Sequence, residues 1–216
     1  MISLHSILFD LGGTVCHQIA DRSFFVEGVQ LPLCIRCSAI HFSLWYAFAT
    51  TLICSGSWIN HISQSTVRII LIGSLAPVAI DVAWQIWGNF LGDNDLRFFT
   101  GLLAGVGIGL FMAKTIASLK QEGSAYAAPM SSIRLTLAVV LFFPIVFAFW
   151  QGNSSLLTVM QYYQGLSVVM VFTVLWGLFY GFFRSSFGYP FPTFSNWTYI
   201  GLSFSIIQAI IFLQIR

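Results

Sequence analysis

The sequence predicts an all-α membrane protein, a polytopic bundle of about six transmembrane helices with a polar N-terminal segment that contains cysteine and histidine. The first observation is composition: 57% of the 216 residues are hydrophobic and 7% are charged, whereas roughly a quarter are charged in an average soluble domain. The second is a mean hydropathy of +0.86. Polar side chains are too few to cover a folded surface in water, so most of the surface must face lipid.

The third observation is a series of apolar stretches, each close to the roughly 20 residues that a membrane-spanning helix needs. The expected spans are 39–59, 67–91, 98–119, 135–150, 156–183 and 197–215. We divide the chain into the polar segment 1–38, a three-span region 39–119 and three further spans within 120–216. Gly101, Gly105 and Gly109 share one face of the third span, which lets a neighbouring helix approach closely.

Charge argues against nucleic acid as a partner. The formal net charge is +2, from nine basic and seven acidic residues spread along the chain. Nucleic-acid-binding surfaces show a stripe of basic residues with interleaved aromatic residues, and this sequence contains no such stripe. The expected partner is therefore the lipid bilayer.

The polar segment holds three of the four cysteines, Cys16, Cys34 and Cys37. The pair Cys34-x-x-Cys37 can place two sulfur atoms around one ion or close a small disulfide. Cys16 and His17 add a third sulfur and an imidazole. We therefore predict a metal site with Cys16, His17, Cys34 and Cys37 as candidate ligands.

The fourth ligand stays open, because Cys16 and His17 are adjacent and cannot easily both point at one metal. His41, Asp81 or water are the alternatives. Thiolate and imidazole ligands together favour zinc, and iron or copper remain possible because ligand type alone does not settle the metal.

A second group of polar residues is expected near the same membrane face. Successive spans run antiparallel, so the start of the first span, the end of the second and the start of the third lie on one side. Asp81 and Gln85 are one helical turn apart, and Asp81 lies roughly 10 to 15 Å below that face at 1.5 Å per residue.

A carboxylate at that depth is costly unless it is compensated. We expect Asp81 to meet a guanidinium group inside the bundle, to bind a cation or to stay protonated. The candidate partners are Arg22, Arg36 and Arg97, and with Gln85 they complete a working pocket whose members are the candidate catalytic residues. The arginines could hold a phosphate or carboxylate of a lipid-linked substrate.

An ordered string of these residues carries a family resemblance. It comprises Cys16-His17-Gln18, Arg22-Ser23-Phe24-Phe25, Gly28, Pro32-Leu33-Cys34-x-Arg36-Cys37, Asp81-x-x-x-Gln85 and Asn94-x-Leu96-Arg97-x-x-Thr100-Gly101. The string resembles a family of prokaryotic membrane proteins, the domain of unknown function 2085, over about residues 14–110. The resemblance implies an integral protein of the prokaryotic inner (plasma) membrane and names no reaction. Where the family tends to read Thr-Gly-x-Tyr, this chain has Ser38-Ala39-Ile40-His41.

Three functions are compatible with these residues. The first is a membrane protein with a zinc-type Cys/His site and a buried Asp/Gln/Arg pocket at one membrane face. The second is a membrane thiol–disulfide oxidoreductase that exchanges electrons between Cys34/Cys37 and a quinone. The third is a transporter or channel component lined by Asp81 and Gln85.

Overall fold

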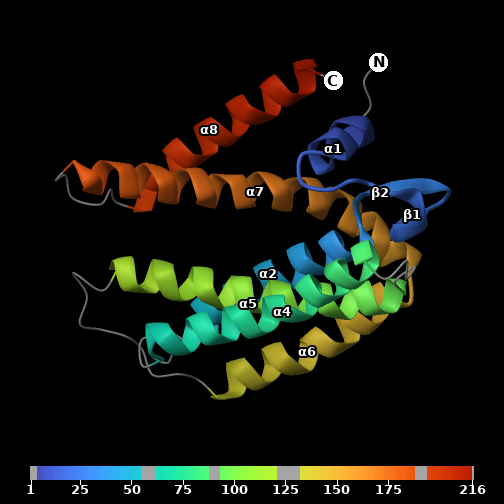
Figure 1. Cartoon of the computed structure of the whole chain (residues 1–216), viewed down its shortest axis with the longest axis horizontal. Coiled ribbons are helices and arrows are strands. Elements are labelled where there is room, and N and C mark those ends of the chain that lie inside the picture. The colour runs from blue at the N-terminus through green and yellow to red at the C-terminus, as the bar shows by residue number, and fades with distance from the viewer. Residues whose placement is uncertain (1–3, 55–61, 88–92, 121–131, 188–193, 216) are drawn as a thin grey trace. The chain divides into compact units, whose positions relative to one another are not determined.

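A computed structural model describes residues 4–54, 62–87, 93–120, 132–187 and 194–215 of the chain. The described part is mostly helical (Figure 1). Its elements are α1 (Leu4–Gly12), η1 (Ala20–Arg22), β1 (Ser23–Val26), β2 (Val29–Cys34), α2 (Ile35–Cys54), α4 (Gln64–Trp87), α5 (Asn94–Lys120), α6 (Ser132–Trp150), α7 (Ser154–Ser186) and α8 (Phe194–Ile215). A helix therefore occupies the described part of each stretch predicted to be helical, and residues 55–59 and 88–91 of the first two predicted spans lie outside the described residues.

The count of six membrane crossings is not supported. In the described residues, three helices are long and apolar enough to cross a bilayer, namely Gln64–Trp87, Asn94–Ser118 and Ser154–Arg184. Helix α2 is not among these three helices. Helix α6 has 19 residues, and its described side chains contribute the apolar stretch Val140–Trp150.

The all-α prediction also missed a two-stranded sheet formed by β1 and β2. Its turn is Glu27-Gly28, and both residues have positive φ, 51° and 81°. Positive φ at both central residues is the geometry of a tight hairpin turn that matches the twist of its strands. The sequence carries the signal, because Phe24-Phe25-Val26 and Val29 flank this glycine. The polar N-terminal segment thus contains a hairpin that follows α1 and η1 and leads directly into α2.

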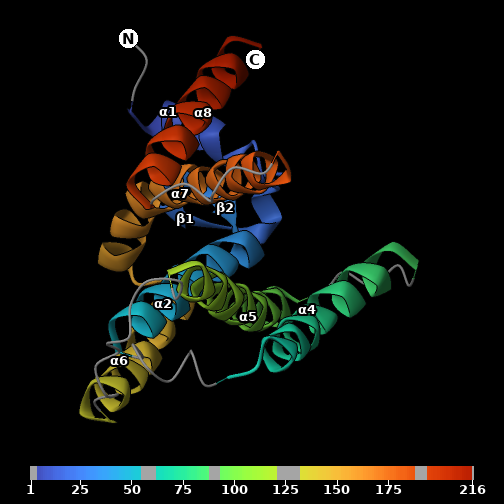
Figure 2. The ribbon, with the colours of Figure 1, turned by 90° about the vertical axis from the view of Figure 1, so that its left-hand side faces the viewer.

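The chain divides into two compact units. We call Cys34–Leu157 the central unit, and Met1–Leu33 together with Thr158–Arg216 the terminal unit. In the central unit, α5 packs against α2 on one side and α4 on the other (Figures 1 and 2).

The predicted glycine face of α5 is confirmed as its contact with α2. A Cβ atom on any of the three glycines would meet an α2 carbonyl oxygen. The contacts, in order along α5, are Gly101 with Arg36, Gly105 with Ile40 and Gly109 with Leu44. Residue numbers rise together along the two helices, so α2 and α5 run parallel.

Helix α4 runs antiparallel to both neighbours. Gly107 of α5 faces Ser74 of α4, whereas the α4 residue Gln85, which is later in sequence, bonds to the earlier α5 residue Arg97. The first turns of α2 and α5 and the last two turns of α4 therefore lie at one end of the central unit, as the alternation of spans predicts. We call this the polar end.

In the terminal unit, α7 packs against α1 and α8. A Cβ on Gly165 of α7 would overlap Leu8 of α1, and a Cβ on Gly201 of α8 would overlap the Thr173 carbonyl of α7. The buried Gln164 of α7 accepts a hydrogen bond from the Leu33 backbone N–H at 3.1 Å. That bond fixes the end of β2 immediately before Cys34.

Candidate functional site

Three cysteine sulfur atoms are close together. The Sγ atoms of Cys16, Cys34 and Cys37 all lie within 4.8 Å of one another. Cys16 is buried, the other two are partly buried, and none of the three forms a disulfide bond. Two sulfurs bound tetrahedrally to one zinc ion at about 2.3 Å stand about 3.8 Å apart. The spacing of the three atoms is therefore compatible with a shared ion.

Gln18 fixes the loop that carries Cys16. Its side-chain Nε2 donates to the Phe9 carbonyl and, at 3.0 Å, to the Pro32 carbonyl, two residues before Cys34. Its backbone has a positive φ of 52°, and its N–H lies 3.4 Å from the Cys16 sulfur. An N–H donor favours the charged form of the atom that it bonds, so this bond suits a thiolate.

The Cys-x-x-Cys pair spans the junction between a strand and a helix. Cys34 is the last residue of β2, and Cys37 lies in the first turn of α2, which begins directly at Ile35. The N-terminus of a helix carries partial positive charge, which stabilises negative charge in its first turn. The local fold therefore places both sulfurs where thiolates are favoured.

The imidazole side chains of the candidate ligands His17 and His41 lie outside the cysteine cluster. His17 is exposed, and His41 is buried in α2 one turn beyond Cys37. Neither belongs to the group of ligand atoms within 4.8 Å, and nor does Asp81. The described structure thus assembles the three cysteines of the predicted site without a fourth side-chain ligand.

A network of polar side chains links α2, α4 and α5 at the polar end. Arg36 forms an ion pair with Asp81, whose side chain is 4% exposed. Gln85 Nε2 donates to Asp81 Oδ1 at 2.8 Å. Arg97 donates to Gln85 Oε1 at 3.3 Å and to Asn94 Oδ1 at 2.8 Å. We call these five residues the arginine–aspartate network.

The network contains four of the five residues expected in the pocket from sequence, namely Arg36, Asp81, Gln85 and Arg97. A guanidinium group meets Asp81 inside the helices, and among the three candidate arginines it is Arg36. Arg97 reaches the carboxylate through Gln85. Arg22 is at the end of η1 in the terminal unit. Asn94 was missed as a member, although its spacing of three from Arg97 on a helix is the signal that could have identified it.

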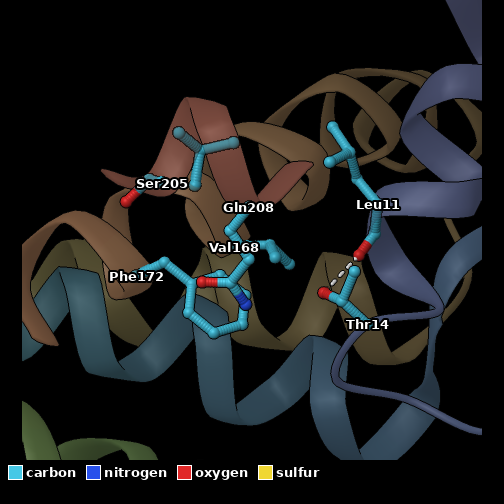
Figure 3. Close-up of a pocket in the computed structure, with 7 residues that line it drawn as sticks. Leu11, Thr14, Val168, Phe172, Ser205 and Gln208 are labelled. Atoms are coloured by element: carbon cyan, nitrogen blue, oxygen red, sulfur yellow. Dashed lines mark hydrogen bonds between the residues drawn. The ribbon is translucent and has the colours of Figure 1, made fainter. Parts of the chain in front are cut away.

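A small pocket occurs in the terminal unit (Figure 3). Its lining comes from α1 and the turn after it, from α7 and from α8, and consists of Leu11, Thr14, Val168, Val169, Phe172, Ser205 and Gln208. Gln208 Oε1 accepts a hydrogen bond from Trp176 Nε1 at 2.7 Å. The lining contains no charged side chain, cysteine or histidine, so metal chemistry is not expected here.

The protein contains helices of membrane-spanning length, a thiol cluster and a buried ion pair. These features place it in the class of helical membrane proteins with a polar end. The chain belongs to the family described as predicted membrane protein (DUF2085), which matches residues 16–111. That range contains the three clustered cysteines and the whole arginine–aspartate network.

Two archaeal relatives are similar to this chain. An uncharacterized protein of Methanocaldococcus jannaschii is 30% identical over 100 residues, which is 45% of this chain and 61% of the relative. An uncharacterized protein of Methanothermobacter thermautotrophicus is 31% identical over 94 residues, 44% of this chain and 80% of the relative. The match thus spans less than two thirds of the first relative. No solved structure matches the chain.

Proposed function

We propose that the protein holds one transition-metal ion, with zinc as the first choice, on Cys16, Cys34 and Cys37 in the plasma membrane of a prokaryote. The observation that carries this proposal is the distance of at most 4.8 Å among the three sulfur atoms. Three cysteines from a loop, a strand end and a helix start come together although they are separated by up to 21 residues. Thiolates are ligands that zinc, iron and copper all accept.

The fourth coordination position determines what the metal does. His17 is adjacent to Cys16 and its exposed side chain lies outside the sulfur cluster, so it binds the metal only if that side chain turns toward the three sulfurs. With His17 bound the site is closed and stabilises the hairpin. With water bound it is open, and the metal activates that water or polarises a substrate at the polar end.

The arginine–aspartate network holds the first turn of α2, and with it Cys37, in a fixed position. Arg36 stands between the two cysteines of the Cys-x-x-Cys pair and ties the first turn of α2 to Asp81 of α4. A fixed first turn keeps Cys37 at one distance from Cys34, which lowers the reorganisation needed to bind an ion. In this proposal Asp81 and Gln85 are positioning residues for the thiol cluster.

Metal content tests the proposal. Protein purified in detergent without a metal-affinity tag should contain about one zinc, iron or copper ion per chain by elemental analysis. Each of Cys16→Ser, Cys34→Ser and Cys37→Ser should lose most of it. Cys54→Ser is the matched control, because Cys54 ends α2 about 25 Å along the helix from Cys37 at 1.5 Å per residue. Wild-type protein without metal would contradict the proposal.

A second candidate function is thiol–disulfide exchange with a quinone. The proximity of the Cys34 and Cys37 thiols, which form no disulfide in the structure, favours it, since two thiols can close to one disulfide and transfer two electrons and two protons to a quinone. In that case the purified protein would be metal-free, and a quinone would convert Cys34 and Cys37 to a disulfide detectable by mass spectrometry. A metal-loaded wild type that a quinone leaves reduced would exclude this function.

A further inference from the structure

The central unit has a basic end opposite to its polar end. The start of α4, the end of α5 and the start of α6 lie there (Figure 1). Helix α6, like α4, runs antiparallel to α5, because Trp150 Nε1 in its last turn donates to Asp95 Oδ1 in the first turn of α5 at 2.8 Å. The basic residues of these helix ends are Arg68, Lys114, Lys120 and Arg134. We call this the basic end.

Acidic residues do not offset these charges. Among the described residues of the basic end, the stretches 47–54, 62–72, 110–120 and 132–140 contain no aspartate or glutamate. The sequence between α5 and α6 has one acidic residue, Glu122, which lies outside the described residues. Four basic residues and one acidic residue leave this end with three excess positive charges.

The polar end presents the opposite charge to water. Its basic residues are Arg36, which is paired with the buried Asp81, and Arg97, which is 6% exposed. The charged residues that are exposed at this end, within the described part of the central unit, are Asp93 and Asp95. The charge of the central unit is therefore asymmetric along its helices.

The two ends are separated by about the thickness of the hydrocarbon core of a bilayer. Trp84 and Trp87 in the last turn of α4 are 63% and 85% exposed, and tryptophan favours the membrane–water interface. Arg68 lies about 28 Å from Trp87 along α4 at 1.5 Å per residue, and the hydrocarbon core is about 30 Å thick. Asp95 and Lys114 have the same spacing on α5. Two helices that are long and apolar enough to cross a bilayer thus place these residues at opposite interfaces.

We propose that the basic end contacts the anionic phospholipid headgroups of the cytoplasmic leaflet, so that the polar end with Cys34 and Cys37 faces the extracytoplasmic side. Basic residues beside membrane spans stay on the cytoplasmic side during insertion. The negative surface potential of the cytoplasmic leaflet then attracts them. The inference rests on the membrane class of the protein and requires neither a bound metal nor a quinone.

This orientation determines the compartment of the thiol cluster. A reducing cytosol opposes disulfides, whereas the extracytoplasmic side permits them. Cys34 and Cys37 would therefore meet metal ions or oxidants that are supplied from outside the cell.

Cysteine labelling at two matched serines measures the orientation. Ser65 lies in the first turn of α4 at the basic end, Ser155 lies in the first turn of α7 after the end of α6 at the polar end, and both are exposed. Full-length Ser65→Cys and Ser155→Cys proteins are treated in intact spheroplasts with a membrane-impermeant maleimide. Peptide mass spectrometry reads each position separately, so the native cysteines stay in place. Position 155 should label before lysis and position 65 only after lysis, and any other pattern overturns the inference.

Two triple variants test the contact with anionic lipid. The first removes three positive charges and consists of Arg68→Gln, Lys120→Gln and Arg134→Gln. The second keeps them and consists of Arg68→Lys, Lys120→Arg and Arg134→Lys. In nanodiscs of equal parts phosphatidylcholine and phosphatidylglycerol, lipid that remains on the protein after brief re-extraction is counted. The charge-keeping variant should retain the enrichment of phosphatidylglycerol seen with wild type, and the charge-removing variant should lose it.

The outcomes are distinct from those of the metal proposal, since metal content is measured on the same samples. Wild-type protein without enrichment of phosphatidylglycerol, or equal enrichment by the two triple variants, overturns the lipid contact. A protein without metal that shows the expected labelling pattern supports the orientation and rejects only the proposed metal centre.

Discussion

Arg36 of α2 forms an ion pair with the buried carboxylate of Asp81 on α4. The pair joins the helix turn that carries Cys37 to the helix that carries Gln85, and so connects the thiol cluster with the arginine–aspartate network. Both predicted groups of polar residues therefore share one structural element, the first turn of α2.

Replacing Asp81 should destabilise the protein. Asp81→Asn removes one partner of a buried ion pair and leaves the Arg36 guanidinium uncompensated, which typically costs about 3 to 5 kcal/mol. The double variant Asp81→Asn/Arg36→Gln should recover part of that loss, because no unpaired charge remains. Thermal unfolding of the detergent-solubilised proteins measures the cycle. A single Asp81→Asn variant as stable as wild type would contradict the buried pair.

Adding a methyl group between α2 and α5 should also destabilise the protein. A Cβ on Gly105 would overlap Ser43 and the Ile40 carbonyl, so Gly105→Ala must push the two helices apart. Overpacking of this kind costs about 1 to 3 kcal/mol. Gly73→Ala in α4 is the control, since nothing lies within 4 Å of its Cβ, and it should be neutral or stabilising by up to about 1 kcal/mol. Similar losses in thermal unfolding for both variants would contradict the close packing.

Gln18 should affect metal affinity without being a ligand. Gln18→Ala removes the bonds to the Phe9 and Pro32 carbonyls that fix the Cys16 loop, and loss of such a supporting contact typically weakens a metal site about ten- to hundredfold. Competition with a chromophoric chelator measures the affinity. Gln151→Ala, at an exposed glutamine after α6, should bind metal like wild type. Equal affinities of the two variants would show that Gln18 does not position Cys16.

Acid should release the metal. Protons compete with the metal for the three sulfur atoms, so binding releases protons and the affinity falls as pH falls. The chelator competition repeated at successively lower pH should show this fall in wild type, with recovery when the pH is raised again. A pH-independent affinity would indicate ligands other than the cysteines.

The positions of the helices and the alternating direction of successive helices could be predicted, because they follow from hydrophobic length and glycine spacing alone. Gly101, Gly105 and Gly109 recur every four residues, which defines one helix face whatever the rest of the chain does. The number of membrane crossings could not be predicted in the same way. Helix α2 has the length of a span but is not among the three helices that are long and apolar enough to cross a bilayer in the described residues.

The partners within the candidate site were only partly predictable. Helical spacing places Asp81, Gln85 and the arginines at one end, but arginine side chains are long enough that sequence cannot choose between Arg36 and Arg97. The clustering of Cys16 with Cys34 depends on the hairpin and on the bonds of Gln18. The Glu27-Gly28 turn was overlooked because the segment was classified by its polarity and not by its strand pattern.

X-ray absorption at the edge of the bound metal tests the proposed centre most directly, because it counts and identifies the ligand atoms. If Cys16, Cys34 and Cys37 hold a zinc ion, the spectrum of wild-type protein shows three sulfur neighbours at about 2.3 Å and one nitrogen or oxygen neighbour at about 2.0 Å. Cys34→Ser would lose the metal or one of the sulfur neighbours. A wild-type spectrum with nitrogen and oxygen neighbours alone, or a protein without any metal, would contradict the account.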